Sequence, residues 1–307
     1  MKNHAFLIQA HAYPNQLFDI VNLLKADNHF FFINIDAKNS RAFTKQDLQQ
    51  LKRIKNVHLS DKNIIVNHGG FSQIECTISL LKQAFNHPVN IDYFHSLSGQ
   101  DYPCMNNSNF DGLFENNNNS YMHFDSPGEI TEWQKDKYPW RINNYHLIDE
   151  LYIPYLNVSY PSILTRLALK VNDKLKLKRS EIPNLIGGWS WFSWHRKVTE
   201  YVLNYLSDNP SYLKRFKLTC CGDEIIFHTL LNDVAEELGI EKYNSLRYIE
   251  WHPKRESPTF PLVLDEREYD DITKSGAVFC RKLHPEKSEG LIERLKERIN
   301  RNFIFSH

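Results

Sequence analysis

The sequence has little that would place it in a membrane, in an oxidising compartment or on DNA. No stretch approaches the roughly 20 apolar residues of a membrane-spanning helix, and the apolar run 5–10 is too short for the core of a signal peptide. The five cysteines form no CxxC pair, which favours a reducing cytoplasm. Lys+Arg and Asp+Glu both number 37, so the basic excess of a nucleic-acid-binding protein is missing. We therefore expect a cytoplasmic protein with no nucleic-acid partner.

Short motifs of several enzyme classes are also missing. The chain has no GxGxxG, GxxxxGK[ST], HExxH or GxSxG pattern, which argues against dinucleotide-binding enzymes, P-loop enzymes, zinc proteases and α/β-hydrolases. It also lacks an Asp-x-Asp triplet, the carboxylate spacing that usually holds Mg²⁺ or Mn²⁺ on a nucleotide diphosphate. We expect neither a bound metal nor another cofactor.

The first hundred residues alternate between short apolar strands and amphipathic helices. Strands are predicted at 5–9, 30–35, 57–59, 64–66 and 93–97, and helices at 15–25 and at 73–85 with Ser72 as its cap. This alternation predicts an α/β fold with a mainly parallel central sheet flanked by helices. Ligands bind beyond the carboxyl ends of such strands, where the sequence places His11, Asp36 and the segment 98–103.

The rest of the chain is less regular and shows no clear linker. Helices are predicted at 198–206, 222–231 and 285–302, and strands at 246–251 and 277–280. We expect one domain over residues 1–307. Its first half covers about 1–110, and its second half covers about 111–307.

Two features of the second half allow more than one interpretation. Trp189 and Trp191 fall on a predicted strand, where we expect their rings on opposite faces. The core is the expected place of both, with the edge of a sugar site as the alternative for one. The basic stretch 170–179 is most simply a solvated surface. Peripheral membrane association is the alternative for it.

Eight short blocks, taken together and in order, resemble one known family. They are Gln9–His11, Ile33–Asp36, His68–Ser72, Leu97–Pro103, Gly188–Phe192, Gly222–Glu224, Arg247–Trp251 and Ser275–Lys282. In this order the chain resembles the core-2/I-branching glycosyltransferases (glycosyltransferase family 14) over about residues 4–295. That family includes β-1,6-N-acetylglucosaminyltransferases and peptide O-xylosyltransferases. The resemblance implies a GT-A type fold, a bacterial member without a membrane anchor, and an inverting, metal-independent transfer from a UDP-sugar. It also implies that about 1–110 is the nucleotide-binding half and about 111–307 the acceptor and catalytic half.

The resemblance also implies a catalytic base and a cation for the leaving group. Glu224 matches the family's base, which would take the proton of the attacking acceptor hydroxyl. Asp223 would cap the helix or orient that base, although both acids could simply favour the positive end of a helix. Lys282 matches the lysine on the donor pyrophosphate, with an ordinary surface lysine as the alternative. For a second cation we choose Arg255 over Lys254, because a guanidinium can bind phosphate through two hydrogen bonds.

Further donor residues follow from the same match. His11 and Asp36 would line the uridine and ribose pocket, with a core histidine and a strand-end cap as their alternatives. His68 would stack on uracil, although the family has an aromatic residue there. Ser98 and Asp101 would bind the donor, and for Asp101 a purely structural turn is an equal alternative.

For the acceptor the match points to Glu129, Arg141 and Trp251, because an aromatic ring covers the apolar face of a sugar and charged groups bind its hydroxyls. The expected partners are a UDP-sugar donor and a glycan or glycoconjugate acceptor. UDP-GlcNAc is the leading donor and UDP-xylose the second. A non-catalytic sugar- or nucleotide-binding protein and a glycoside hydrolase are the alternatives from other classes.

Overall fold

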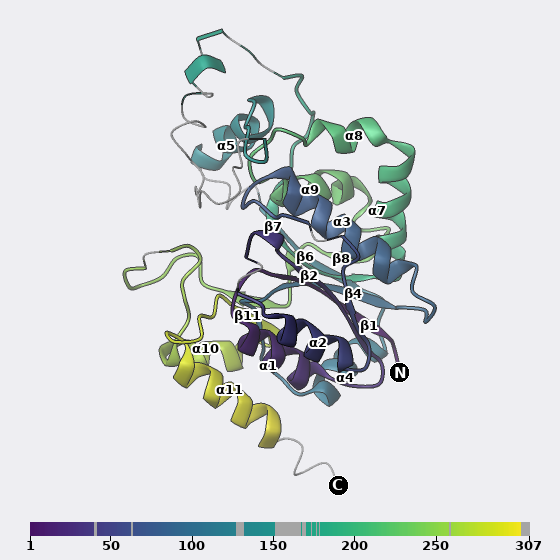
Figure 1. Ribbon diagram of the computed structural model, residues 1–307. Helices are drawn as coiled ribbons and strands as arrows, with labels where there is room; N and C mark the ends of the chain where they lie inside the picture. Colours follow the sequence, from purple (N-terminus) through teal and green to yellow (C-terminus); the bar gives the residue numbers. More distant parts are fainter. Residues whose placement is uncertain are drawn as a thin grey trace.

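The computed structural model describes residues 1–39, 42–62, 64–126, 132–150, 179–257 and 259–301, together with positions 167, 170–172, 174–175 and 177. Its centre is an eight-stranded sheet with the strand order β3-β2-β1-β4-β7-β6-β8, and β9 pairs with β6. Helices cover both faces of this sheet (Figure 1). The predicted α/β class with a mainly parallel central sheet is confirmed.

The first half of the chain builds the parallel part of the sheet. Its strands are β1 (His4–Ala10), β2 (His29–Ile35), β3 (Val57–Leu59) and β4 (Tyr93–Ser98). The helices that follow the first three are α1 (Pro14–Leu24), α2 (Lys45–Arg53) and α3 (Phe71–Phe85), with the short turn η1 (Ala37–Asn39) after β2. The four strands pair in parallel, and β1 and β2 are almost entirely buried. Burial on both faces explains their nearly continuous apolar sequence.

The second half extends the sheet and adds a smaller one. Strand β7 (Gly188–His195) runs antiparallel to β4 and to β6 (Ser120–Phe124). The short strands β8 (Ile240–Glu241) and β9 (Tyr243–Asn244) flank β6. A three-stranded sheet joins β10 (Arg247–Ile249), β11 (Phe279–Arg281) and β5 (Tyr102–Pro103). This second sheet brings the segment that ends in Lys282 beside the turn that follows β4.

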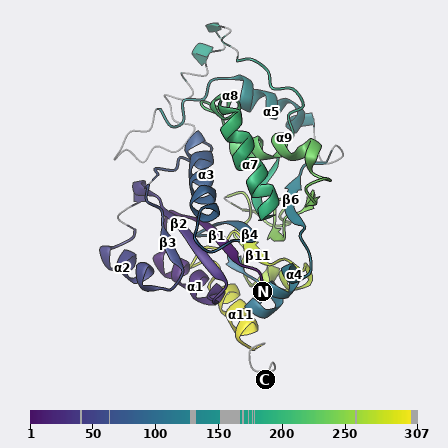
Figure 2. The same cartoon turned by 90° about the vertical axis from the view of Figure 1, so that its right-hand side faces the viewer.

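Two hydrophobic cores lie on the two faces of the central sheet. One face carries α3, α7 (Arg196–Asp208), α8 (Pro210–Arg215) and α9 (Ile226–Leu231), and the other carries α1, α4 (Asn107–Glu115), α10 (Tyr269–Lys274) and α11 (Glu289–Arg301) (Figures 1 and 2). Side chains alternate between these cores along each strand: Ala5 and Leu7 pack in the first, and Phe6 and Ile8 in the second. The remaining elements are α5 (Glu132–Asn143), η2 (Gly222–Glu224), η3 (Asn232–Val234) and η4 (Glu266–Glu268).

Three local predictions were wrong. Residues 64–66 form no strand, because the amides of Ile64 and Val66 donate to the side chains of Asn34 and Asp36 instead of to a neighbouring strand. Helix α3 begins at Phe71, so Ser72 lies inside its first turn and is not its cap. The predicted helix 222–231 is divided into η2 and α9. Among the described residues, no helix is long and apolar enough to span a bilayer.

Candidate active site

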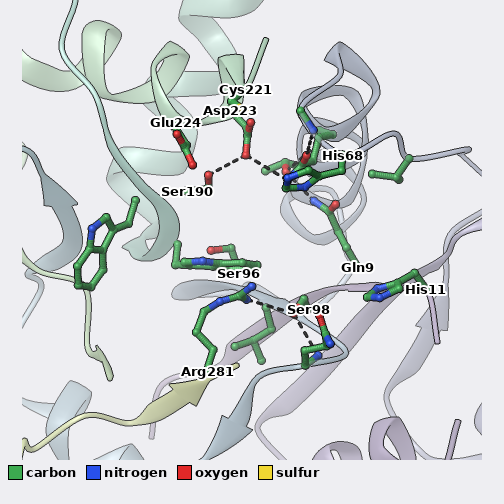
Figure 3. Close-up of a pocket in the computed structure, with 18 of the residues that line it drawn as sticks. Gln9, His11, His68, Ser96, Ser98, Ser190, Cys221, Asp223, Glu224 and Arg281 are labelled. Carbon is green, nitrogen blue, oxygen red and sulfur yellow. Dashed lines mark hydrogen bonds between the residues drawn. The ribbon is translucent and has the colours of Figure 1, made fainter. Parts of the chain in front are cut away.

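A pocket of about 620 Å³ opens at the carboxyl ends of β1, β2 and β4. It brings together eight residues that the sequence predicted for the site. They are His11, Asp36, His68, Ser98, Arg141, Glu224, Trp251 and Lys282. The close-up in Figure 3 shows Glu224 and Asp223 on one side of the pocket, with Arg281, Ser98 and His11 across from them.

The acidic side of the pocket is built on the short turn η2. Cys221, just before η2, has left-handed backbone angles (φ 48°), and its amide donates to the carbonyl of Gly69 over 2.7 Å. Asp223 is buried and accepts hydrogen bonds from Ser190 Oγ (2.7 Å) and Gln73 Nε2 (3.1 Å). Burial and the neighbouring Glu224 raise the pKa of Asp223. Both acids of η2 line the pocket. Asp223 is buried and held in place by its contacts, and Glu224 is the more exposed of the two carboxylates.

Glu224 forms an ion pair with a residue of α5. Arg141 Nη1 donates to Glu224 Oε2 over 2.5 Å. The side chain of Glu224 is 33% exposed, whereas that of Arg141 is 8% exposed. Burial acts to lower the pKa of Arg141. The Glu224 carboxylate, together with Cys221 and Cys220, outweighs burial, so the pKa of Arg141 is raised. The predicted base and a predicted acceptor-binding residue thus contact each other directly.

The basic side of the pocket contains a residue that sequence reasoning missed. Arg281 lines the pocket beside Lys282, and its Nη1 donates to Asp101 Oδ2 over 2.9 Å and to Ser98 Oγ over 3.2 Å. Its guanidinium lies 3.9 Å from the centre of the Trp191 ring, close enough for a cation–π contact. Arg281 is therefore fixed in position by a carboxylate and an aromatic ring before any ligand binds.

Asp101 does not line the pocket but holds residues that do, Ser98 and Arg281. The side chain is 1% exposed, and Oδ2 accepts from the amide and the hydroxyl of Ser98, both over 2.6 Å. These bonds close the turn between β4 and β5, and the same oxygen holds Arg281. Of the two predicted roles, this geometry supports the structural turn.

Lys282, His11 and Asp36 lie where β1, β2 and β11 end. Burial and the neighbouring Arg281 lower the pKa of Lys282. Burial also lowers the pKa of His11, against the opposing effect of Asp36. Asp36 is buried, and its Oδ1 accepts from the amides of Lys38 (3.0 Å) and Val66 (3.3 Å). The Asp36 carboxylate thus organises the loop after β2 as well as lining the pocket.

Three tryptophans also line the pocket. Trp189 and Trp191 are two residues apart on β7, so they share a face of the strand, and both line the pocket. The prediction that they lie on opposite faces and belong to the core was therefore wrong. Trp251 also lines the pocket, and its ring centre is 6.1 Å from that of Trp189 at an interplanar angle of 49°.

Besides Asp101, the predicted site residue Arg255 is not brought into the pocket. Arg255 pairs with Asp265 (3.0 Å) and Glu268 (3.1 Å) and is not among the described residues that line the pocket. The two carboxylates explain why Arg255 is absent from the lining, because they already form ion pairs with its guanidinium. Glu129 lies outside the described residues, as do positions 173, 176 and 178 of the basic stretch 170–179.

Comparisons with known proteins agree with the blocks found in the sequence. The family model described as "Branch: Core-2/I-Branching enzyme" matches residues 4–272. The chain is 22% identical over 269 residues to the β-glucuronosyltransferase GlcAT14A of Arabidopsis thaliana; the match covers 84% of this chain and 56% of that protein. The chain thus spans little more than half of that relative's length.

Two solved structures have a looser likeness to this fold. The galactosyltransferase LgtC in complex with donor and acceptor sugar analogues has 12% identity and a TM-score of 0.40, with 97% of this chain and 95% of that chain covered. The 4-diphosphocytidyl-2C-methyl-D-erythritol synthase of Anaerococcus prevotii has 9% identity and a TM-score of 0.34, with coverage of 89% and 96%. Because the family model matches most of the chain, the protein belongs to the core-2/I-branching family of glycosyltransferases.

Proposed function

We propose that this protein transfers a sugar from a UDP-sugar to a hydroxyl of a glycan acceptor, with inversion at the anomeric carbon and without a metal ion. One observation carries the proposal. A single pocket presents the Glu224 carboxylate on one side and the Arg281 cation on the other, and Lys282, next to Arg281 in the chain, also lines it. An inverting transfer needs a base at the attacking hydroxyl and positive charge at the leaving group.

Glu224 is proposed as the base because it is the partly exposed carboxylate of η2. The acceptor hydroxyl gives its proton to Glu224 while its oxygen bonds to the anomeric carbon. The bond from that carbon to the diphosphate oxygen breaks, and UDP leaves with the electron pair. Arg141 is proposed as a positioning residue, because its contact with Oε2 orients the carboxylate and leaves Oε1 for the proton.

Arg281 and Lys282 are proposed to hold the diphosphate. Negative charge grows on the leaving oxygen during the reaction, and fixed cations stabilise it with little reorganisation. Arg281 is the better placed of the two for this task, since Asp101 and Trp191 already hold it. This assignment replaces Arg255, whose guanidinium pairs with Asp265 and Glu268.

The remaining lining residues are proposed to bind the two sugars and the nucleoside. His11, Asp36 and His68 lie near the end of β1 and β2, where the uridine would bind. Trp189 and Trp251 offer ring faces of the kind that cover the apolar face of a pyranose. UDP-GlcNAc is the leading donor and UDP-xylose the second. UDP-glucuronic acid joins the test because the Arabidopsis relative is named a β-glucuronosyltransferase.

Thermal denaturation of the purified protein tests this proposal. The protein is melted with UDP, UDP-GlcNAc, UDP-xylose, UDP-glucuronic acid or GDP, each with EDTA and with Mn²⁺. Each shift is taken against the ligand-free protein in the same buffer. A ligand that binds only the folded chain raises its apparent stability by mass action. We expect a shift with UDP that persists in EDTA, with the largest shift for the true donor.

Two results would count against the proposal. If no UDP compound shifts the melting temperature at millimolar concentration, the donor roles of Asp36, Arg281 and Lys282 fail. The non-catalytic sugar-binding protein and the hydrolase then become the better readings. If the shift appears with Mn²⁺ but not with EDTA, donor binding needs a metal and the fixed cations do not replace it.

A further inference from the structure

A second polar cluster lies at the amino ends of the strands whose carboxyl ends form the pocket. His4 begins β1, His29 begins β2, and Asp111 lies on α4. Among the described residues, this is the group whose His, Cys, Asp or Glu ligand atoms lie close enough to hold a metal ion, all within 4.8 Å of one another. Both imidazoles are fully buried, and the Asp111 side chain is 17% exposed.

The contacts of His29 call for a proton or a metal ion between its ring and Asp111. His29 Nδ1 lies 2.5 Å from the carbonyl oxygen of Leu24, which can only accept, so Nδ1 carries a proton. In a neutral ring His29 Nε2 then bears a lone pair. That atom faces Asp111 Oδ1 at 2.8 Å, and two lone-pair atoms at this distance repel. Either a proton between His29 Nε2 and Asp111 Oδ1, held by one of them, or a metal ion resolves the contact.

His4 distinguishes between these two solutions. Its Nε2 is buried without a hydrogen-bond partner among the described residues and lies 3.6 Å from the same Asp111 oxygen. A proton on His29 would satisfy His29 and Asp111 but would leave His4 Nε2 unpaired, at the cost of a buried polar atom. An ion between the three side chains satisfies all of them.

The spacing and the surroundings suit zinc. Two ligand atoms about 2.05 Å from a tetrahedral zinc ion lie about 3.3 Å apart. The measured separations of 2.8 Å and 3.6 Å lie on either side of that value. The other nitrogens of both rings have the partners that orient metal-binding histidines: Leu24 O for His29, and His95 Nε2 at 3.0 Å for His4.

We propose that His4, His29 and Asp111 bind one divalent metal ion of the zinc class, which ties β1 and β2 to α4. Two imidazoles and a carboxylate are ligands that Zn²⁺ prefers, and water can complete its coordination. The ion is structural in this proposal, because the cluster and the pocket lie at opposite ends of the same strands. It is independent of the proposed transferase reaction.

Metal titration of the protein, purified without a histidine tag and stripped with a chelator, tests this site. Co²⁺ is added first, since its visible absorption reports tetrahedral histidine ligation, and Zn²⁺ is then used to displace it. Metal content is measured by mass spectrometry after gel filtration. We expect about one ion per chain and a higher melting temperature with Zn²⁺. Less than about a tenth of an ion per chain and no change in melting temperature would overturn the proposal.

A pair of variants locates the ion. Asp111→Asn keeps the size of the side chain at a partly exposed position and should weaken Co²⁺ binding at least about tenfold. The matched control is Asp19→Asn on α1, an acid that pairs with Lys296 over 2.6 Å and lies outside the cluster. Unchanged Co²⁺ affinity in folded Asp111→Asn would place the ion elsewhere and overturn the proposal. If that variant does not fold, the wild-type stoichiometry and cobalt spectrum decide alone.

Discussion

Two arginine–carboxylate pairs support the pocket from opposite sides, and they are buried in opposite senses. In the pair Arg141–Glu224 the arginine is 8% exposed and the carboxylate 33% exposed. In the pair Arg281–Asp101 the arginine is 11% exposed and the carboxylate 1% exposed. The same kind of pair, an arginine with a carboxylate, thus presents an acid to the pocket on one side and a cation on the other.

The comparison shows how the chain gives two ends of a pocket opposite chemistry. In each pair the more buried partner fixes the group that the pocket presents, through a charge-assisted hydrogen bond. The buried partner also compensates the presented charge, because a partly buried charge without a partner would lower the free energy of unfolding. This arrangement suits a reaction that removes a proton at one end and develops negative charge at the other.

Neutralising the acidic side should have the largest effect. Glu224→Gln keeps the shape of the side chain and an oxygen for Arg141, but it removes the base, so we expect a loss of about a thousandfold in kcat. UDP affinity should stay unchanged. Both are measured by a transfer assay and by titration with UDP. The matched control is Glu75→Gln on the exposed side of α3, and a kcat for Glu224→Gln within a few-fold of that control would remove Glu224 from the reaction.

Removing the buried acid of the other pair should instead affect folding. Asp101→Ala leaves Arg281 without its carboxylate and breaks the bonds that close the turn at Ser98. We expect the free energy of unfolding to fall by about 3 kcal/mol, as measured by urea denaturation. The half-exposed pair of Asp19 and Lys296 provides a control, and Asp19→Ala should cost much less. Equal losses of unfolding free energy in the two variants would show that Asp101 stabilises the fold no more than an ordinary surface ion pair does.

A milder change tests the presented cation itself. Arg281→Lys keeps the charge but loses the planar group that pairs with Asp101 and stacks on Trp191. We expect UDP affinity to fall about tenfold, which corresponds to about 1.4 kcal/mol. Arg255→Lys is the matched control, because that arginine pairs with Asp265 and Glu268 outside the lining. A larger loss of UDP affinity in the control would return the diphosphate role to Arg255.

The smallest expected effect is a pH dependence of stability that comes from a buried histidine, His228, and not from either arginine–carboxylate pair. Burial lowers the pKa of His228 to about 3, whereas an unfolded chain has a histidine pKa of about 6.5. Below pH 6.5 the unfolded chain therefore binds the proton first, and the free energy of unfolding falls as the pH falls toward 3. Between about pH 7 and pH 5.5 we expect His228 to account for a loss of about 1 kcal/mol. His228→Gln should lessen this pH dependence in urea denaturation, and an unchanged slope would contradict the assignment.

The local pattern of the sequence predicted the parallel strands but not everything around them. The runs at β1 and β2 are mostly apolar because both faces are buried, and such runs are readable from sequence. Residues 64–66 look equally apolar, yet their amides at 64 and 66 donate hydrogen bonds to the side chains of Asn34 and Asp36 and not to a neighbouring strand. Side-chain contacts of this kind leave no periodic trace in the sequence.

Most of the predicted residues that line the pocket stand in recognisable blocks of the sequence, and Arg141 is the exception. Glu224 and Lys282 stand in such blocks, and both line the pocket. Arg281 was missed because its partners, Asp101 and Trp191, are distant in the chain and meet it only through the second sheet. Arg255 was chosen over Lys254 for its chemistry, and spacing could not reveal that two nearby carboxylates already hold it.

The stereochemistry of the product tests the central claim most directly. The protein is incubated in EDTA, well below its melting temperature in that buffer, with the UDP-α-sugar that binds best and an acceptor glycan. The anomeric configuration of the new linkage is then read by NMR. The account predicts a β-linked product formed at the same rate with and without EDTA. An α-linked product, or transfer that stops in EDTA while the protein stays folded, would contradict it.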